Sequence, residues 1–200
     1  MKLILVRHGQ TDWNKNRMTQ GQSDTELNRT GVFQAKKVAA ALKKENISYC
    51  YYSPLKRAKS TADIISDYLN IDSKADESLI ELNFGLWEGM TLDQISMNYE
   101  QEFTNWSYFP HKVVIPQGEN MEDALKRSKL FIDFIAANNR GNILVVSHGL
   151  LIKTLILAAL NFELKDLQKF RVDNASINII EFKGERRYLS KLNDTSHLYK

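Results

Sequence analysis

Near the start of the chain stands the sequence Leu3-Ile4-Leu5-Val6-Arg7-His8-Gly9. Its four apolar residues predict a short buried strand, and the change to arginine, histidine and glycine marks the point where that strand ends. Residues 142–146 repeat the pattern, because this second apolar run is followed by Ser147-His148-Gly149. Buried strands of this length, alternating with helical patterns, are typical of a parallel sheet that has helices packed on its faces.

Apolar residues at helical spacing alternate with short apolar runs along most of the chain. Helices are predicted at residues 28–45 and 53–69, from residue 120 onward, and at 149–160. Strands are predicted at residues 3–6, 47–52, 142–146, 176–182 and 187–192. Ser53 and Pro54 supply a capping residue and a first-turn proline for the second helix, and Gly184 lies in the turn of a hairpin between the last two strands. We therefore expect an α/β fold, a three-layer α/β/α sandwich with a mostly parallel central sheet and at least one antiparallel strand.

The chain has 200 residues, which is enough for one α/β domain with its own core, so we expect a single domain over residues 1–200. Residues 81–117 fit neither the helical nor the strand pattern, and aromatic residues are crowded there among loop residues. We expect this segment to be an irregular insertion that covers a site, like a cap. Its aromatic residues are Trp87, Tyr99, Phe103, Trp106, Tyr108 and Phe109.

Composition and charge argue against several classes of protein. A net charge of +3 is too slight to indicate a nucleic-acid partner, and the apolar runs are too short or too interrupted to span a membrane. Cys50 is the only cysteine, which excludes an internal disulfide. Together with a start that lacks the pattern of a secretory signal, this predicts a cytoplasmic protein. His111 and His197 lie outside any motif, and we expect both at the surface.

Three strand ends carry cationic or imidazole side chains. Arg7 and His8 end the first strand. Arg57 follows the strand at residues 47–52, and His148 follows the strand at 142–146. Carboxyl ends of parallel strands meet at one edge of a sheet, and this concentration of positive charge would be repulsive unless an anion lay within it. A phosphoryl group suits the forked hydrogen bonds of guanidinium groups, but carboxylate or sulfate could use the same cations, so the pattern predicts an anion site and no particular reaction.

A histidine at the centre of such a site is a candidate nucleophile, because neighbouring positive charge keeps its imidazole unprotonated at neutral pH. His8 and His148 each end an apolar strand and each precede a glycine. This placement favours a functional role over a purely structural hydrogen bond. Gly9 and Gly149 would let backbone amides approach a ligand closely.

These residues resemble the histidine phosphatase superfamily, also called the phosphoglycerate mutase-like family. The segment from Leu5 to Thr11 is similar to the opening motif of the family, although the family often has glutamate at the position of Gln10. The resemblance runs in order to about residue 182. The further matching residues are Trp13-Asn14, Gln20-Gly21, Leu27, Thr30-Gly31, Ser53-Pro54, Arg57-Ala58, Thr61-Ala62, Glu81, Trp87-Glu88-Gly89, Gly118-Glu119 and Ser147-His148-Gly149.

The resemblance implies a two-step phosphoryl transfer that needs no metal or organic cofactor. His8 attacks phosphorus and becomes phosphohistidine while Glu81 protonates the leaving group, and water that Glu81 deprotonates then releases phosphate. Arg7, Arg57 and His148 complete the catalytic set by holding the phosphoryl oxygens. By the same resemblance, the phosphate-binding residues are Arg7, Asn14, Gln20, Gly21, Arg57, His148 and Gly149.

Two carboxylates compete for the role of acid. Glu81 matches the acid position of the family, whereas Glu88 lies close by in the Trp87-Glu88-Gly89 motif. We expect Glu81 to act and keep Glu88 as the alternative. Trp13 and Trp87 are expected to pack around the site rather than to contact the substrate.

Hydrolysis is expected rather than mutase transfer, because a mutase needs extra cations around the pocket. Between Gly85 and Gly118 the chain offers only His111 and Lys112, against four carboxylates. We therefore expect a small-molecule phosphomonoester, a sugar, nucleoside, ribazole-like or amino-acid phosphate, with a neutral or partly apolar body. That body would rest against Phe103, Trp106, Tyr108 and Phe109.

Three alternatives stay open at this point. They are mutase-type phosphoryl transfer, a phosphate-binding protein without chemistry, and a hydrolytic metal site. The metal site would be built from His8, His148, Asp12 and Glu81, and the fixed positive charge of the two arginines disfavours it. The oligomeric state is open as well, with a homodimer as one alternative.

Overall fold

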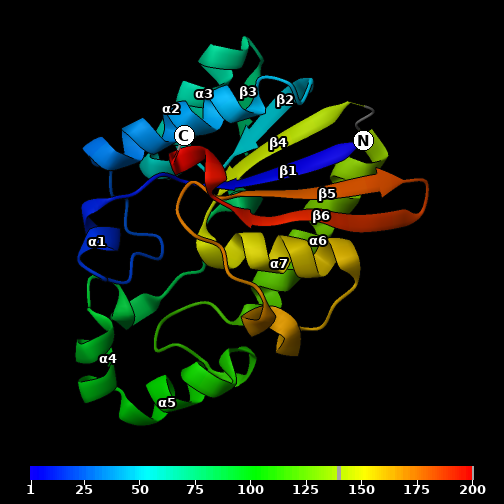
Figure 1. Ribbon diagram of the computed structural model, residues 1–200. Coiled ribbons are helices and arrows are strands. Elements are labelled where there is room, and N and C mark those ends of the chain that lie inside the picture. The colour runs from blue at the N-terminus through cyan, green and yellow to red at the C-terminus, as the bar shows by residue number, and fades with distance from the viewer. Residues whose placement is uncertain (139–140, 200) are drawn as a thin grey trace.

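The computed structural model describes residues 1–138 and 141–199. At its centre lies a six-stranded sheet with the strand order β3-β2-β4-β1-β5-β6 (Figure 1). The pairs β1–β4, β2–β4 and β2–β3 are parallel, whereas β5 is antiparallel to both β1 and β6. The strands are β1 (Lys2–Arg7), β2 (Ile47–Tyr52), β3 (Ser73–Ala75), β4 (Asn142–Ser147), β5 (Ile177–Lys183) and β6 (Arg186–Asp194). The mostly parallel sheet and the antiparallel hairpin are as predicted, but β3 carries no apolar pattern and was missed.

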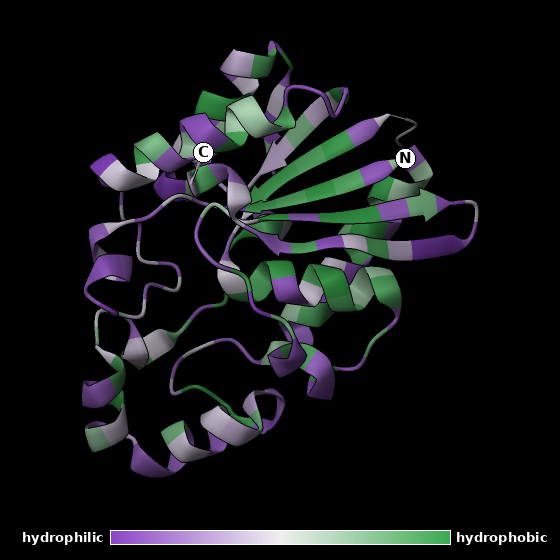
Figure 2. Ribbon diagram, in the orientation of Figure 1, coloured by the Kyte–Doolittle hydropathy of each residue, from purple (hydrophilic) through white to green (hydrophobic). Residues whose placement is uncertain are grey.

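Helices cover both faces of this sheet, as the three-layer prediction requires. Helices α2 (Arg29–Leu42) and α3 (Lys56–Leu69) pack on one face, and α6 (Met121–Asn138) and α7 (Gly149–Leu160) pack on the other. Each face has its own apolar core, because side chains alternate along the strands. The central strands are accordingly apolar along most of their length (Figure 2).

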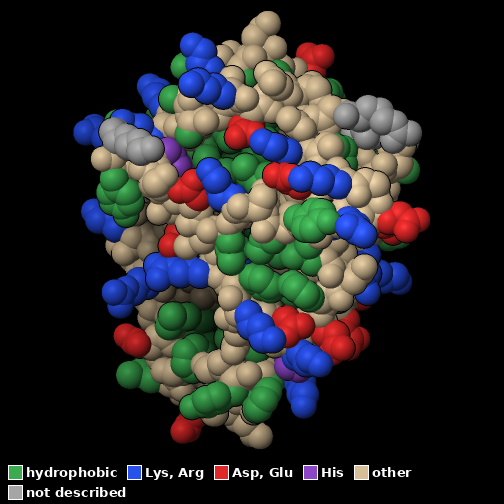
Figure 3. Space-filling view, turned by 45° about the vertical axis from the view of Figure 1, so that its right-hand side comes forward, with side chains coloured by type: hydrophobic (Ala, Val, Ile, Leu, Met, Phe, Trp, Pro, Cys, Tyr) green, Lys and Arg blue, Asp and Glu red, His purple; other side chains and the backbone are tan. Residues whose placement is uncertain are grey.

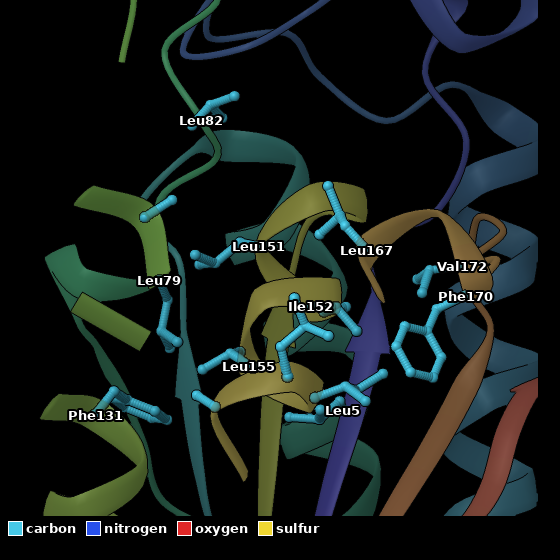
Figure 4. Packing of buried hydrophobic residues seen from close by; sticks show 14 of the residues in the cluster. Leu5, Leu79, Leu82, Phe131, Leu151, Ile152, Leu155, Leu167, Phe170 and Val172 are labelled. Carbon is cyan, nitrogen blue, oxygen red and sulfur yellow. The ribbon is translucent and has the colours of Figure 1, made fainter. Parts of the chain in front are cut away.

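The core on the face covered by α6 and α7 shows how α7 is held against the sheet. Leu5 of β1 lies beside Ile152 and Leu155 of α7, and the ring of Phe170 packs on the other side of Leu5 (Figure 4). Because α7 is apolar on nearly every side, it is buried along most of its length. This burial fixes the N-terminus of α7 at the end of β4, where the predicted site lies.

Local capping explains where the helices begin, with one departure from the prediction. The side chain of Asn28 accepts a hydrogen bond from the backbone N–H of Gly31 at 2.9 Å and starts α2 at Arg29. The prediction that Ser53 caps the next helix is wrong, because α3 begins at Lys56 and Ser53 has another partner, described below.

The segment at 81–117 is more regular than the sequence suggests. Two helices, α4 (Leu92–Asn98) and α5 (Glu100–Tyr108), replace the expected irregular chain. Trp87 is buried and packs edge-on against Trp106, with ring centroids 5.7 Å apart. Trp87 is therefore a packing residue, as expected. The short helix α1 (Asp12–Lys15) lies across from α4 in the same part of the molecule (Figure 1).

Several expectations about surface and burial are tested as well. Cys50 is buried in β2, and within the described part of the chain no helix has the length and apolar character needed to cross a bilayer. On the face drawn in Figure 3, described lysines and arginines are interspersed with acidic side chains instead of forming one basic field. The surface prediction for His197 is wrong, because this residue is 8% exposed.

Candidate active site

The predicted strand ends do converge. Arg7 at the end of β1 is paired in register with Ser147 at the end of β4, and Tyr52 at the end of β2 is paired with Val146. A cavity of about 430 Å³ opens at this edge of the sheet. The predicted site residues on its wall are Arg7, His8, Asn14, Gln20, Gly21, Arg57, Glu81 and Gly149.

His8 is buried at the base of this cavity, and its tautomer is defined by a single contact. Nδ1 lies 2.7 Å from the carbonyl oxygen of Gly9. A carbonyl oxygen only accepts, so in the neutral ring Nδ1 carries the hydrogen and Nε2 carries the lone pair. Burial and then the positive charges of Arg57 and Arg7 hold the pKa of His8 well below its ordinary value. Burial is the larger cause, and the charge of the two arginines, which the sequence predicts, is the smaller one.

The two arginines are held by backbone carbonyls rather than by carboxylates. Arg57 donates from Nη1 to the carbonyl of Ser23 at 2.8 Å and from Nη2 to that of Gly21 at 2.6 Å. Arg7 donates from Nη1 to the carbonyl of Val172 at 2.7 Å. Burial lowers the pKa of Arg57 to about 10, which leaves it charged at neutral pH. Nε of each arginine is buried without a hydrogen-bond partner among the residues described, which indicates a site for an anion.

His148 lies behind His8, with ring centroids 5.2 Å apart, and is fully buried rather than exposed on the cavity wall. Its Nε2 is 2.7 Å from Oγ of Ser53. Burial first, and then the charge of Arg57, holds the pKa of His148 well below its ordinary value. Ser53 therefore positions an imidazole instead of capping α3.

Glu81 is buried on the cavity wall, and backbone N–H groups orient its carboxylate. Oε1 accepts from Leu82 at 2.9 Å and from Leu151 at 3.1 Å, and Oε2 accepts from Leu150 at 3.2 Å. Two of these donors belong to the first turn of α7, which begins directly after His148. The same helix end thus fixes Glu81 relative to the two histidines.

Glu88 does not line the cavity and has a different environment. Its Oε1 accepts from the backbone N–H of Gln22 at 2.8 Å and of Phe84 at 3.1 Å. Its Oε2 accepts from the backbone N–H of Ser23 at 2.8 Å and from the Ser23 hydroxyl at 2.6 Å. Glu88 thus ties the cap segment to the loop whose carbonyls hold Arg57. This arrangement favours Glu81 as the acid and makes Glu88 a positioning residue.

Gly21 is placed in that same loop with a φ of +56°. A Cβ atom at this position would collide with the carboxylate of Glu88. Glycine is therefore favoured both by the left-handed backbone conformation and by the close approach of Glu88.

The two amide side chains predicted at the site both line the cavity. Oδ1 of Asn14 accepts from the backbone N–H of Thr11 at 3.1 Å and from Nδ2 of Asn174 at 3.0 Å. Oε1 of Gln20 accepts from the Thr11 hydroxyl at 3.0 Å. With their oxygens engaged, both amides present donors to an anion. Asn174 also donates to the carbonyl of His8 at 3.1 Å, and sequence patterns did not single it out.

The two motif glycines have different roles. Gly9 donates its backbone N–H to the Thr61 hydroxyl at 3.1 Å, and a Cβ there would collide with the backbone of Gly31. The expectation that the Gly9 amide faces a ligand is therefore wrong, since this glycine permits a close packing of two chain segments. Gly149 does line the cavity, and a Cβ there would lie 3.4 Å from Cζ of Arg7.

The apolar wall of the cavity differs from the prediction. Trp106 lines it, but Phe103 packs into the core of the cap, and Tyr108 and Phe109 are 69% and 52% exposed outside the cavity. Their places are taken by Met18, Phe84, Leu92, Phe170 and Val172. Two cations on the wall, Lys153 and Arg171, were also missed.

The donor set of the metal alternative is not assembled. Among residues 1–138 and 141–199, no group of three or more His, Cys, Asp or Glu side chains is arranged to hold a metal ion. The geometry described above is that of an anion site.

Comparison with known proteins agrees with this geometry. The model of the histidine phosphatase superfamily (branch 1) matches residues 3–195. Phosphoserine phosphatase 1 of Hydrogenobacter thermophilus is 34% identical over 199 residues, covering 99% of this chain and 94% of that protein. A probable phosphoglycerate mutase of Yersinia pestis (strain Pestoides F) is 31% identical over 204 residues, covering 99% of this chain and 95% of that protein. A mutant phosphoserine phosphatase from Entamoeba histolytica, solved in complex with phosphoserine, has a TM-score of 0.87 at 34% identity and covers 98% of each chain.

The chain belongs to the histidine phosphatase superfamily, as the resemblance of its motifs predicts. It is a hydrolase of the phosphatase class, and its substrate class is that of small phosphorylated metabolites.

Proposed function

We propose that this phosphatase hydrolyses its substrate through a phosphohistidine on His8. The hydrogen bond from Nδ1 of His8 to the Gly9 carbonyl, at 2.7 Å, carries the proposal, because it leaves the lone pair on Nε2. The low pKa of His8 keeps that lone pair unprotonated at neutral pH. Arg7 and Arg57 supply positive charge for the phosphoryl oxygens without protonating the nucleophile.

In the first step, Nε2 of His8 forms a bond to phosphorus while the bond from phosphorus to the ester oxygen breaks. Glu81 in its acid form gives its proton to the departing oxygen, which leaves as an alcohol. The arginines, His148 and the amides of Asn14 and Gln20 hold the oxygens of the transferring group. Gly21 and Gly149 complete the wall around it.

In the second step, a water molecule attacks phosphorus on the opposite side of the His8 bond. Glu81, now a carboxylate, accepts a proton from that water, and the bond between Nε2 and phosphorus breaks. Inorganic phosphate leaves, and both residues return to their starting forms. Every proton is accounted for by the chain, the substrate and water, so we propose no metal or organic cofactor.

Hydrolysis is favoured over mutase transfer by the composition of the cap. His111 and Lys112, the only cations there, do not line the cavity, and the ammonium of Lys112 lies over the ring of Phe109 at 5.3 Å. The cap therefore adds no charge that would retain a phosphorylated product for a second transfer. A binding protein without chemistry is disfavoured, because the proposed nucleophile, acid and phosphate-binding groups occupy one cavity.

Phosphate release from a panel of metabolites and from p-nitrophenyl phosphate tests this function, with His8→Ala as the control. We expect release by the wild type that survives exhaustive chelation and is lost in the variant. Phosphate binding without release would support the binding-protein alternative. Turnover of 3-phosphoglycerate to 2-phosphoglycerate faster than phosphate release would support the mutase. O-Phosphoserine belongs in the panel because two similar proteins are phosphoserine phosphatases.

The remaining predictions extend the proposal to the cell. We propose a cytoplasmic enzyme of one domain over residues 1–200, in which residues 81–117 act as the cap of the site. Its partners are small phosphomonoesters, without nucleic acid or membrane. Size-exclusion chromatography with light scattering distinguishes a monomer from the homodimer that the sequence leaves open.

A further inference from the structure

Two cations of the cavity wall have no part in the reaction proposed above. Lys153 lies on α7 and Arg171 lies in the segment between Phe170 and Val172, and both line the cavity that contains His8. Arg7 and Arg57 already offset the charge of a phosphoryl group. The additional cations therefore point to a second anionic group on the substrate.

Lys153 is the more informative of the two. It lies one helical turn after Gly149 and on the same face of α7, about 6 Å further along the axis by the rise of an α-helix. Its side chain is half-buried, and no carboxylate of the described residues lies within ion-pair distance of its ammonium. Burial, and next the charge of Arg7, lowers the pKa of Lys153. An anion bound beside the Lys153 ammonium would compensate for its burial and offset its repulsion by Arg7.

Arg171 lies at the rim of the same wall. Phe170 and Val172 on either side of it are buried, and their side chains point toward the core around Leu5 (Figure 4). Arg171 itself is 80% exposed, and its Nε donates to Oδ1 of Asp173 at 2.8 Å. Its position is therefore fixed by its neighbours, but Asp173 offsets part of its charge. Arg171 therefore supplies positive charge at the rim of the cavity, and Lys153 supplies it inside the cavity.

We infer that Lys153, assisted by Arg171, binds the carboxylate of a short-chain phosphorylated hydroxy acid or amino acid. Lys153 and Gly149, which lines the phosphate end of the cavity, are separated by one helical turn. This separation suits a substrate in which about two carbons lie between the phosphoester oxygen and the carboxylate. Phe84, Leu92 and Trp106 form the apolar remainder of the wall. The inference rests on the proposed phosphatase function. It replaces the expectation of a neutral substrate body, because that expectation took into account only the cations of the cap.

The test compares two substrates that differ only in the carboxylate, O-phospho-L-serine and O-phosphoethanolamine. The wild type is expected to have the higher kcat/KM for O-phospho-L-serine. Lys153→Met should lower that value by about 10- to 100-fold, the usual effect of losing one charge-assisted hydrogen bond, and change the value for O-phosphoethanolamine by less than about 3-fold. Lys153→Arg should keep most of the preference, and Lys112→Met in the cap, outside the cavity, should leave it unchanged.

Three outcomes would overturn the inference while leaving the phosphatase function intact. They are equal losses on both substrates, no change on either, and a wild type that hydrolyses p-nitrophenyl phosphate through His8 but not O-phospho-L-serine. Loss of the His8 dependence itself would instead refute the proposed function. Circular dichroism of Lys153→Met and Lys153→Arg identifies a variant that has not folded. If Lys153→Met does not fold, Lys153→Gln, which also removes the charge, takes its place in the same comparison of the two substrates.

Discussion

Oγ of Ser53 lies 2.7 Å from Nε2 of His148, and both groups are fully buried. The Ser53 oxygen also accepts the backbone N–H of Leu55 at 3.4 Å, and we expect the Ser53 hydroxyl to donate its hydrogen to His148. A neutral His148 that accepts at Nε2 carries its own hydrogen on Nδ1. That Nδ1 is buried without a hydrogen-bond partner in the described residues, and we propose that it donates to a phosphoryl oxygen of the bound substrate.

Ser53→Ala tests this relationship. Without the hydroxyl, the favoured tautomer of His148 is no longer enforced, and we expect kcat to fall about 10-fold. Removing the donor itself with His148→Ala should cost more, about 10²- to 10³-fold. Nitrogen-15 NMR of the imidazole shows which ring nitrogen carries the hydrogen. An unchanged Nδ1–H tautomer together with unchanged kcat in Ser53→Ala would contradict the assignment.

Glu81→Gln tests the acid. We expect kcat/KM to fall about 10²- to 10⁴-fold with an alkyl phosphate, because the alkoxide needs a proton to leave. With p-nitrophenyl phosphate the loss should be much smaller, since p-nitrophenolate leaves without protonation. Equal losses on both substrates would show that Glu81 is structural.

Glu88→Gln is the matched comparison for that experiment. The amide can replace one carboxylate oxygen as an acceptor but sets an NH₂ group against the other donors, so the loop that holds Arg57 should loosen. We expect losses of similar size with both leaving groups and weaker inhibition by inorganic phosphate. A leaving-group dependence like that of Glu81→Gln would instead identify Glu88 as the acid.

Gly21→Ala tests the same loop through its backbone. An alanine at φ +56° is strained and collides with the Glu88 carboxylate. We expect a loss of about 1–3 kcal/mol in the free energy of unfolding, measured by urea denaturation. Gly184→Ala is the control, because this glycine also has a positive φ, of +62°, but a Cβ there meets nothing within 4 Å. A similar loss in both variants would show that backbone strain alone explains the effect.

The two buried histidines also predict how stability depends on pH. Their pKa values lie well below the ordinary value of 6.5 in the folded protein, so below pH 6.5 the unfolded chain binds protons that the folded chain does not. Their contribution to stability is therefore complete above 6.5 and is lost as the pH falls toward the folded values. As the pH is lowered from about 7 to about 5, the midpoint temperature of thermal unfolding should fall more steeply in the wild type than in His148→Gln. Identical declines would contradict buried, neutral histidines.

The sheet and its helices could be predicted because burial leaves a direct pattern in the sequence. Leu5 and Val146 belong to uninterrupted apolar runs, and α2 has its apolar residues at helical spacing. Strand β3, with the sequence Ser73-Lys74-Ala75, has no such pattern, since pairing with β2 at the sheet edge alone defines it. Likewise α5 is stabilised by the packing of Trp106 against Trp87, which no local pattern reveals. Helix α4, in contrast, begins at a capping box of Thr91 and Gln94, which is a local signal.

The site was predictable only in part, for the same physical reason. His8, Arg57 and His148 stand at strand ends, where topology brings them together. Lys153 lies within an apolar helix and Arg171 within a loop, and their exposure to one cavity depends on tertiary packing. Ser53 satisfies the local rule for a helix cap. It follows β2, however, which pairs with β4, and His148 follows β4, so the Ser53 hydroxyl is hydrogen-bonded to His148 instead of capping a helix.

The proposed reaction requires that phosphorus is transferred to Nε2 of His8. Rapid-quench labelling tests it most directly: the wild type is mixed with a radiolabelled substrate, quenched in alkali during the first turnovers, and digested to locate the label. An alkali-stable, acid-labile label on the peptide that contains His8, formed and lost at rates that match turnover and absent from His8→Ala, is the predicted result. Normal turnover in the wild type with no label on His8 at any time would contradict the claim.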